Sequence, residues 1–216
     1  MDFDQLRRFE RINVVRTSGS GKSTFARELA EVLRLPCYEM DHLFWKPGWQ
    51  ESSDDELCRK VREVTSQPQW VLDGNYTRTT PDKWKHVQLV VWLDLPFVPT
   101  LYRVTKRAVH RSLTRQELWP GTGNRESLVK AFLSKDSVIW WAITNYRSNR
   151  RKYSAIMTSP EFSHIHFVRL RSPRMVASCL EGLRRAGVPG QNSPKFNVQS
   201  PRSGRKRTED GESLNL

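Results

Sequence analysis

Hydrophobic residues follow two patterns along the chain, short apolar runs and longer stretches with helical spacing. The short runs predict buried strands, at residues 12–15, 37–40, 69–72, 87–93 and 164–170. The longer stretches carry an apolar residue every three or four positions and predict helices, at residues 22–34, 54–67, 98–112, 138–157 and 173–186. Because strands alternate with helices, the pattern indicates an α/β domain with a parallel sheet that helices cover on both faces.

The same pattern divides the 216 residues into three parts. Residues 1–10 form a polar lead-in with at most a frayed helical turn, and residues 11–186 carry all the predicted strands and helices. Residues 187–216 are rich in Gly, Pro and Ser and have Phe196 as their only aromatic residue, which predicts a disordered tail. We therefore expect one domain, long enough to bury a core of its own.

A segment rich in Gly and Ser, TSGSGKST, lies between the first predicted strand and the first predicted helix. Small residues let consecutive backbone N–H groups curl around phosphate oxygens, and the helix N-terminus adds partial positive charge. A Walker A motif requires this strand–loop–helix context, so we predict that the segment binds ATP. The predicted phosphate-binding residues are Thr17, Ser18, Gly19, Ser20, Gly21, Lys22, Ser23 and Thr24.

Within this motif, Lys22 would reach the β- and γ-phosphates of ATP, and the hydroxyl of Ser23 would bind Mg²⁺. The alternative is a Gly/Ser turn that only caps the helix. Arg16 departs from the pattern GxxxxGK[ST], which has glycine at this position so that the loop has room to fold back. An arginine there either points to solvent or distorts the loop. The sequence therefore predicts nucleotide binding and leaves efficient turnover open.

Two more motifs accompany the loop, YEMD followed by FWKPGW over residues 38–49 and VLDGNY over residues 71–76. With them, residues 11–185 resemble the adenylate-kinase-like P-loop kinases, in particular the subgroup labelled DNA topology modulation protein. The segment WLDLP at 92–96 is similar to the end of the fourth strand in such kinases. The resemblance implies a P-loop NTPase fold: five parallel strands, the phosphate loop at the centre, an acceptor-binding segment after the second strand and an arginine-rich lid after the fourth.

Two acidic residues, Asp41 and Asp73, each follow or end a predicted strand. That edge of a parallel sheet is where α/β proteins bind their ligands. Asp73 would hold Mg²⁺ through water, and Asp41 would orient or deprotonate the phosphoryl acceptor, as the resemblance implies. The alternatives are that Asp41 caps the next turn and that Asp73 forms an Asx turn into Gly74.

Positive charge is concentrated in the region where the resemblance puts the lid. The chain has 36 Lys and Arg against 23 Asp and Glu, a formal net charge of +13, and residues 101–152 hold 12 of the basic but 3 of the acidic residues. Arginine forks match the oxygens of a phosphoryl group in transfer. The alternative is an exposed basic helix with incidental spacing. The predicted lid arginines are Arg107, Arg111, Arg147 and Arg151, with Arg103 and Arg150 beside them.

These features predict a phosphotransferase that moves the γ-phosphoryl group of ATP, with Mg²⁺, to a nucleotide or another small acceptor. Trp45 and Trp49 would lie near the acceptor, where an aromatic ring could stack on a base. One alternative is a nucleic-acid-associated P-loop ATPase, which the net charge favours although no DNA- or RNA-binding motif is visible. Another is a degenerate nucleotide-binding homologue that Arg16 impairs.

Other classes of protein are less compatible with the sequence. No apolar stretch approaches the ~20 residues that a bilayer requires, and the first residues carry acids where a secretory signal would be apolar. The cysteines Cys37, Cys58 and Cys179 are far apart, which indicates reduced thiols in a cytoplasmic protein. The histidines lack ligand spacing, so we expect no bound transition metal.

Overall fold

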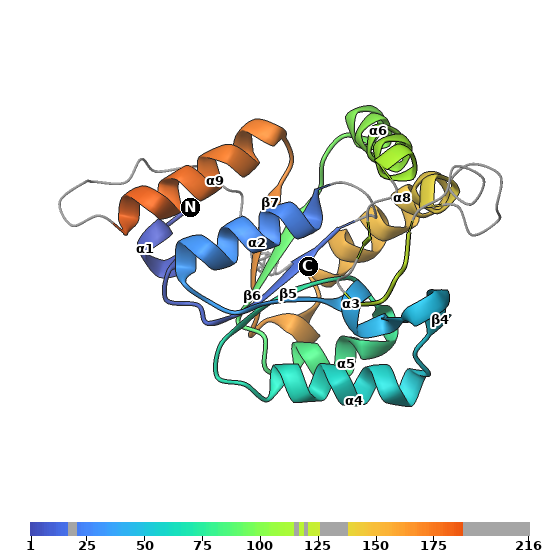
Figure 1. Ribbon diagram of the computed structural model, residues 1–216. Coiled ribbons are helices and arrows are strands. Elements are labelled where there is room, and N and C mark those ends of the chain that lie inside the picture. Colours follow the sequence, from blue (N-terminus) through green and yellow to red (C-terminus); the bar gives the residue numbers. More distant parts are fainter. Residues whose placement is uncertain (17–20, 115–116, 119–120, 126–137, 188–216) are drawn as a thin grey trace, which may run out of the picture.

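The computed structural model describes residues 1–16, 21–114, 117–118, 121–125 and 138–187, and its centre is a five-stranded parallel sheet (Figure 1). The strand order is β2–β5–β1–β6–β7, with β1 in the middle. This arrangement confirms the predicted fold class, a five-stranded parallel sheet flanked by helices. The strands are β1 (Arg11–Val15), β2 (Cys37–Glu39), β5 (Trp70–Asp73), β6 (Leu89–Leu93) and β7 (His166–Leu170).

The three central strands are mostly apolar and almost entirely buried, because helices cover both sides of the sheet. All residues of β5 and β6 are buried, including the large side chains of Trp70 and Trp92. In the register of the sheet, Val14 of β1 lies opposite Asp73 of β5 and Val91 of β6. Asp73 therefore lies beside the end of β1, at the edge where the chain leaves the sheet for the predicted phosphate loop.

One face of the sheet is covered by α1 (Phe3–Leu6), α2 (Lys22–Leu33) and α9 (Pro173–Ala186), as Figure 1 shows. The predicted lead-in thus contributes to the core, because Phe3 and Leu6 of α1 are buried in the same cluster as Leu29 and Leu180. A Cβ on Gly182 of α9 would lie 2.3 Å from the Phe3 ring, so glycine allows α1 and α9 to approach.

The other face is covered by α3 (Met40–Phe44), α4 (Asp54–Thr65), α5 (Thr80–Trp84) and part of α8 (Val138–Ile156). Its core contains Leu57, Trp84 and Tyr153 together with β-strand residues. The indole N–H of the buried Trp84 donates to the side-chain oxygen of Asn13 on β1 at 2.9 Å. The long helix α6 (Phe97–Thr114) packs against α8.

A small hairpin follows α3, where the sequence pattern predicts only a loop. Its strands are β3 (Trp45–Lys46) and β4 (Gln50–Glu51), joined through a 3₁₀ turn at Pro47–Trp49. Further 3₁₀ turns lie at Thr77–Thr79 and Pro160–Phe162. The hairpin and α3 together form the segment that follows β2.

The described residues contain no helix long and apolar enough to cross a membrane. The same part of the chain contains no group of three or more His, Cys, Asp or Glu residues that could hold a metal ion. Cys37, Cys58 and Cys179 are free thiols. The predicted tail, residues 187–216, lies outside the described residues from position 188 onward.

Candidate functional site

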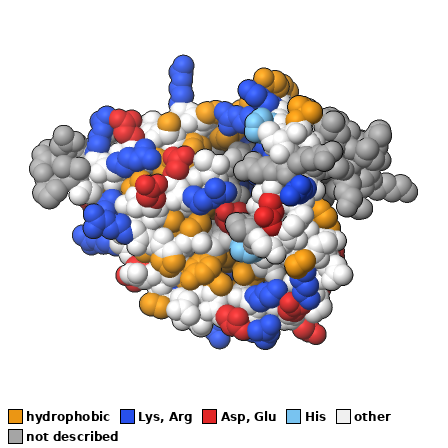
Figure 2. Space-filling model, viewed as in Figure 1, with side chains coloured by type: hydrophobic (Ala, Val, Ile, Leu, Met, Phe, Trp, Pro, Cys, Tyr) orange, Lys and Arg blue, Asp and Glu red, His pale blue; other side chains and the backbone are white. Residues whose placement is uncertain are grey.

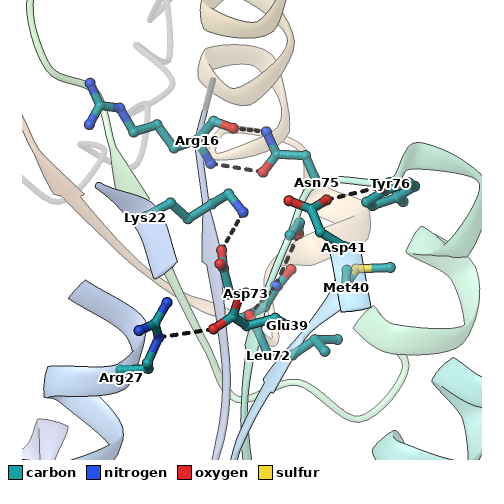
Figure 3. Close-up of polar contacts among 12 residues, drawn as sticks. Arg16, Lys22, Arg27, Glu39, Met40, Asp41, Leu72, Asp73, Asn75 and Tyr76 are labelled. Atoms are coloured by element: carbon teal, nitrogen blue, oxygen red, sulfur yellow. Dashed lines mark hydrogen bonds and ion pairs between the residues drawn. The ribbon is translucent and has the colours of Figure 1, made fainter. Parts of the chain in front are cut away.

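The structure brings together Lys22 and Asp73, two residues that the sequence places in the nucleotide site (Figure 3). Lys22 is the first residue of α2, and its ammonium group pairs with the carboxylate of Asp73, the last residue of β5. The side chain of Asp73 is only 2% exposed. Burial alone would lower the pKa of Lys22, but the carboxylates of Asp73 and Asp41 outweigh it and raise that pKa. Lys22 is therefore protonated, and it lies at the carboxyl end of the central strands.

The start of α2 is built as a phosphate site requires. Gly21 precedes the helix with φ of 85°, a left-handed conformation that a residue with a side chain rarely adopts. Ser23 and Thr24 lie in the first turn of this 12-residue helix, where backbone N–H groups have no partner within the helix. The predicted phosphate-binding residues Thr17, Ser18, Gly19 and Ser20 lie outside the described residues.

The residues predicted to serve Mg²⁺ suit that ion. Hydroxyl and carboxylate oxygens are the ligands that Mg²⁺ prefers, and Ser23 and Asp73 supply one of each at the same end of the sheet. In this structure the Asp73 carboxylate is paired with Lys22, so Asp73 would face the ion, directly or through water, only once Lys22 has moved to the phosphates.

Asp41 lies in the first turn of α3, and its Oδ1 accepts a hydrogen bond from the phenol of Tyr76 at 2.8 Å. Burial and the Asp41 carboxylate raise the pKa of Tyr76, so the phenol keeps its proton and remains a donor. Glu39, two residues earlier, pairs with Arg27 of α2 at 2.9 Å. Asp41, Lys22 and Asp73 thus lie in one acidic and basic cluster (Figure 3).

The motif DGNY explains how the loop after β5 holds this cluster. Gly74 is needed because a Cβ there would lie 2.5 Å from the Cβ of Met40. The side chain of Asn75 bonds both peptide groups of Arg16: its Oδ1 accepts from the Arg16 N–H at 2.8 Å, and its Nδ2 donates to the Arg16 carbonyl. Tyr76 then reaches Asp41. Each residue of the motif therefore has a separate structural role.

The side chain of Arg16 does not point to solvent, one of the two outcomes expected from the sequence; the other outcome, a distorted loop, concerns residues that lie outside the described ranges. Arg16 is buried, only 2% exposed, and points away from the Lys22–Asp73 pair in Figure 3. Its backbone lies outside the left-handed region, where only Arg34 and Trp49 are found among the described non-glycine residues. An arginine is therefore accommodated at this position without the backbone freedom of glycine.

Aromatic residues connect Asp41 and Tyr76 to the hairpin. The Phe44 ring lies between those of Tyr76 and Trp45, at centroid distances of 5.0 and 4.8 Å. Trp45 meets Trp49 edge to face at 5.4 Å. Both predicted acceptor-stacking residues are half-buried on the hairpin, in continuity with Asp41.

The sequence analysis did not single out Asn124, which holds the hairpin in place. Its Oδ1 accepts from the Trp49 N–H at 2.8 Å, and its Nδ2 donates to the Lys46 carbonyl at 2.9 Å. Asn124 belongs to the segment between α6 and α8, so part of the predicted lid region contacts the predicted acceptor segment. Its position within a Gly-Thr-Gly-Asn sequence indicates a turn but gives no sign of this distant contact.

Lys83 of α5 is a second residue that the sequence did not indicate. Its side chain is 1% exposed, and its Nζ lies 3.3 Å from the Gly74 carbonyl and 3.5 Å from the Tyr76 carbonyl. Within the described ranges it pairs with no carboxylate. Burial, with smaller contributions from Lys152 and Lys22, lowers the pKa of Lys83 to about 7.

The predicted lid arginines lie on two helices that pack against each other. Arg107 and Arg111 are half-buried on α6, whereas Arg147 and Arg151 are exposed on α8. Their neighbour Arg150 pairs with Asp94 at 3.3 Å, and Arg169 of β7 binds the same carboxylate at 2.6 and 2.9 Å. Arg150 and Arg169 thus lie at the carboxyl end of β6. The closure of the predicted lid arginines over a nucleotide remains a prediction.

No protein-family model matches the chain, and no curated protein does. Among solved structures, a gluconokinase from Sinorhizobium meliloti 1021 is 17% identical with a TM-score of 0.46, over 82% of this chain and 92% of that one. A shikimate kinase from Acinetobacter baumannii, in complex with shikimate, is 17% identical with a TM-score of 0.40, over 73% of this chain and 100% of that one. The case for an activity therefore comes from the side chains of the site.

Proposed function

We propose that this protein is an adenylate-kinase-like phosphotransferase, which moves the γ-phosphoryl group of ATP to a small acceptor such as a nucleotide. The observation that carries the proposal is the pair of Lys22 and Asp73 at the centre of the sheet. A buried lysine at a helix N-terminus next to a buried carboxylate is the arrangement expected of a MgATP site. The carboxylate of Asp41, held by Tyr76, would orient the acceptor or take its proton.

In this proposal, Lys22 leaves Asp73 for the β- and γ-phosphates when ATP binds at the start of α2. Asp73 and Ser23 would then hold Mg²⁺, and the ion would supply positive charge to the phosphates. Arg107, Arg111, Arg147 and Arg151 would neutralise charge on the phosphates from the side of α6 and α8.

Asp41 is proposed to receive the proton of the acceptor hydroxyl. Tyr76 occupies its Oδ1, so Oδ2 is the atom that would take the proton. The acceptor oxygen bonds to the γ-phosphorus as the bond to the bridging oxygen breaks, and ADP leaves. The aromatic cluster of Phe44, Trp45 and Trp49 beside Asp41 supports an acceptor with a flat apolar part.

The test is transfer of label from γ-³²P-ATP to a panel of nucleosides, nucleotides and small hydroxy compounds. Lys22→Ala should lose transfer by at least about a hundredfold while circular dichroism shows a retained fold. The matched control is Lys85→Ala, which replaces an exposed lysine at the opposite end of the sheet and should retain activity. Transfer that survives in Lys22→Ala would remove this site from the reaction.

A second candidate function, binding of nucleic acid, is supported by the outer face of α6. This helix contains no acidic residue, and its exposed positions include Arg103 and Lys106. Val98 and Tyr102 on the same helix are 73% and 66% exposed. Figure 2 shows basic and apolar side chains together at the top of the molecule, over α6. Basic groups beside an exposed aromatic ring, here that of Tyr102, suit single-stranded nucleic acid.

Filter binding of a single-stranded oligonucleotide across a salt series tests this candidate. Affinity should fall steeply as salt rises, and Arg103→Glu with Lys106→Glu should weaken it at every salt concentration. No retention at the lowest salt would discard the candidate.

A further inference from the structure

Arg16 occupies the position where the phosphate-loop pattern has glycine, and the side chain of Asn75 holds both its N–H and its carbonyl. Asn75 bonds the N–H and the carbonyl of Arg16, as a neighbouring strand would, and so extends the pairing of β1 with β5 by one residue. The last residue before the predicted phosphate loop is therefore fixed to the sheet. The side chain of Arg16 therefore starts from a backbone position that Asn75 holds in place.

That side chain reaches α6. The Nη2 of Arg16 donates to the Oγ1 of Thr100 at 2.5 Å. The Thr100 hydroxyl itself donates to the Pro96 carbonyl at 2.7 Å, which directs its lone pairs toward the guanidinium. Thr100 is buried in the first turn of α6, the helix that carries Arg103, Arg107 and Arg111. Glycine at position 16 could make no such contact.

The surroundings of the guanidinium make its position consequential. Arg16 lines a small cavity with Asp94, Tyr146 and Arg150. Burial and the charge of Arg103 lower the pKa of Arg16 to about 9, while Tyr146 and Asp94 act in the opposite direction, so the group is still charged at neutral pH. Asp94 attracts the guanidinium and Arg103 of α6 repels it, so the energy of the Arg16 side chain depends on where α6 places Arg103.

We propose that Arg16 is a positioning residue that couples the start of the phosphate loop to α6 and its arginines. The inference rests on the proposed function, since it concerns how nucleotide binding at α2 is transmitted to the helix that would face the phosphates. In this chain, arginine in place of glycine connects the start of the phosphate loop to α6. It is a functional replacement and not a damaged motif.

Amide hydrogen exchange of α6, with and without MgATP, tests the coupling in the full chain. In the unaltered protein MgATP should slow exchange of α6 by at least about fivefold. Arg16→Gly and Thr100→Val should each abolish most of that slowing, and the double variant should add nothing further. Arg16→Lys, which keeps a cation and a donor, should restore part of it. Thr105→Val, on the same helix, should behave like the unaltered protein.

Calorimetric titration with MgATP separates this inference from the proposed function. If a variant only lowers the overall stability of the protein, amide exchange becomes faster in α4 as well as in α6, and MgATP still slows exchange in α6. If Arg16→Gly binds MgATP more tightly and α6 still responds, Arg16 impairs the loop and the coupling is wrong. If neither the unaltered protein nor any variant binds MgATP, the proposed function itself fails.

Discussion

Tyr76 donates its phenolic hydrogen to the carboxylate of Asp41 across 2.8 Å, and so joins the loop after β5 to the first turn of α3. The two residues are 35 positions apart in the sequence. Because burial and the carboxylate raise the pKa of Tyr76, the donor is present over the whole physiological pH range. The bond fixes the orientation of the Asp41 carboxylate, the group proposed to act on the acceptor.

Replacing Tyr76 by Phe removes this hydrogen bond and keeps the ring that packs on Phe44. We expect kcat for phosphoryl transfer to fall about tenfold, because a hydrogen bond to a charged group contributes about 1.5 kcal/mol. The KM for ATP should stay the same, since Tyr76 acts on the acceptor side. Steady-state kinetics with the best acceptor measure both values. An equal rise in the KM for ATP would mean that the bond supports the whole site and not Asp41.

Replacing Asn75 by Ala leaves both peptide groups of Arg16 without their side-chain partner. The expected loss is about 2 kcal/mol in the free energy of unfolding, since two partly buried polar groups lose hydrogen bonds. Urea denaturation followed by far-UV circular dichroism gives the value. Gln67→Ala, at an exposed position after α4, is the matched control and should change stability by less than about 0.5 kcal/mol. Equal stability of the two variants would contradict the role given to Asn75.

Replacing Gly182 by Ala puts a methyl group against the Phe3 ring, 2.3 Å away in the present packing. Overpacking of this kind costs about 1–3 kcal/mol, so thermal unfolding should occur at a lower temperature. In a Phe3→Ala background the same change should be nearly neutral, because the space then exists. If Gly182→Ala lowers the unfolding temperature equally in both backgrounds, the strain does not come from contact between positions 3 and 182.

Sequence patterns predict the long elements of this fold well. The last helix is predicted over residues 173–186 and is observed as Pro173–Ala186, because Ser172 caps it, Pro173 starts it and Gly187 follows it. Lys22 and Asp73 could be predicted because motif and strand end fix their place along the chain, and the sheet order then brings them together.

Other features depend on contacts that no local pattern records. The strands of the hairpin are two residues long, too short for an alternation to be visible. The polar lead-in hides two core residues, Phe3 and Leu6, within a single helical turn. The burial of Arg16 and Lys83 is set by distant partners, and charged residues in a sequence indicate solvent by default.

Lys83 leads to a prediction about pH. Its pKa is about 7 in the folded protein and has an ordinary value of 10.5, so between these values the unfolded chain binds more protons than the folded one. Stability that depends on Lys83 should therefore rise with pH from about 7 toward 10. Below pH 7 both states are protonated, and the full cost of the buried charge, on the order of a few kcal/mol, is present.

Lys83→Met isolates this contribution, because Met fills the same space without a charge. Urea denaturation at pH 6, 7.5 and 9 should show a stability gain in the variant that is largest at pH 6 and shrinks as pH rises. The neighbouring cations Lys22 and Lys152 are present in both proteins and cancel in the comparison. A difference between the proteins that stays constant from pH 6 to 9 would mean that Lys83 remains charged throughout, held by the carbonyls of Gly74 and Tyr76.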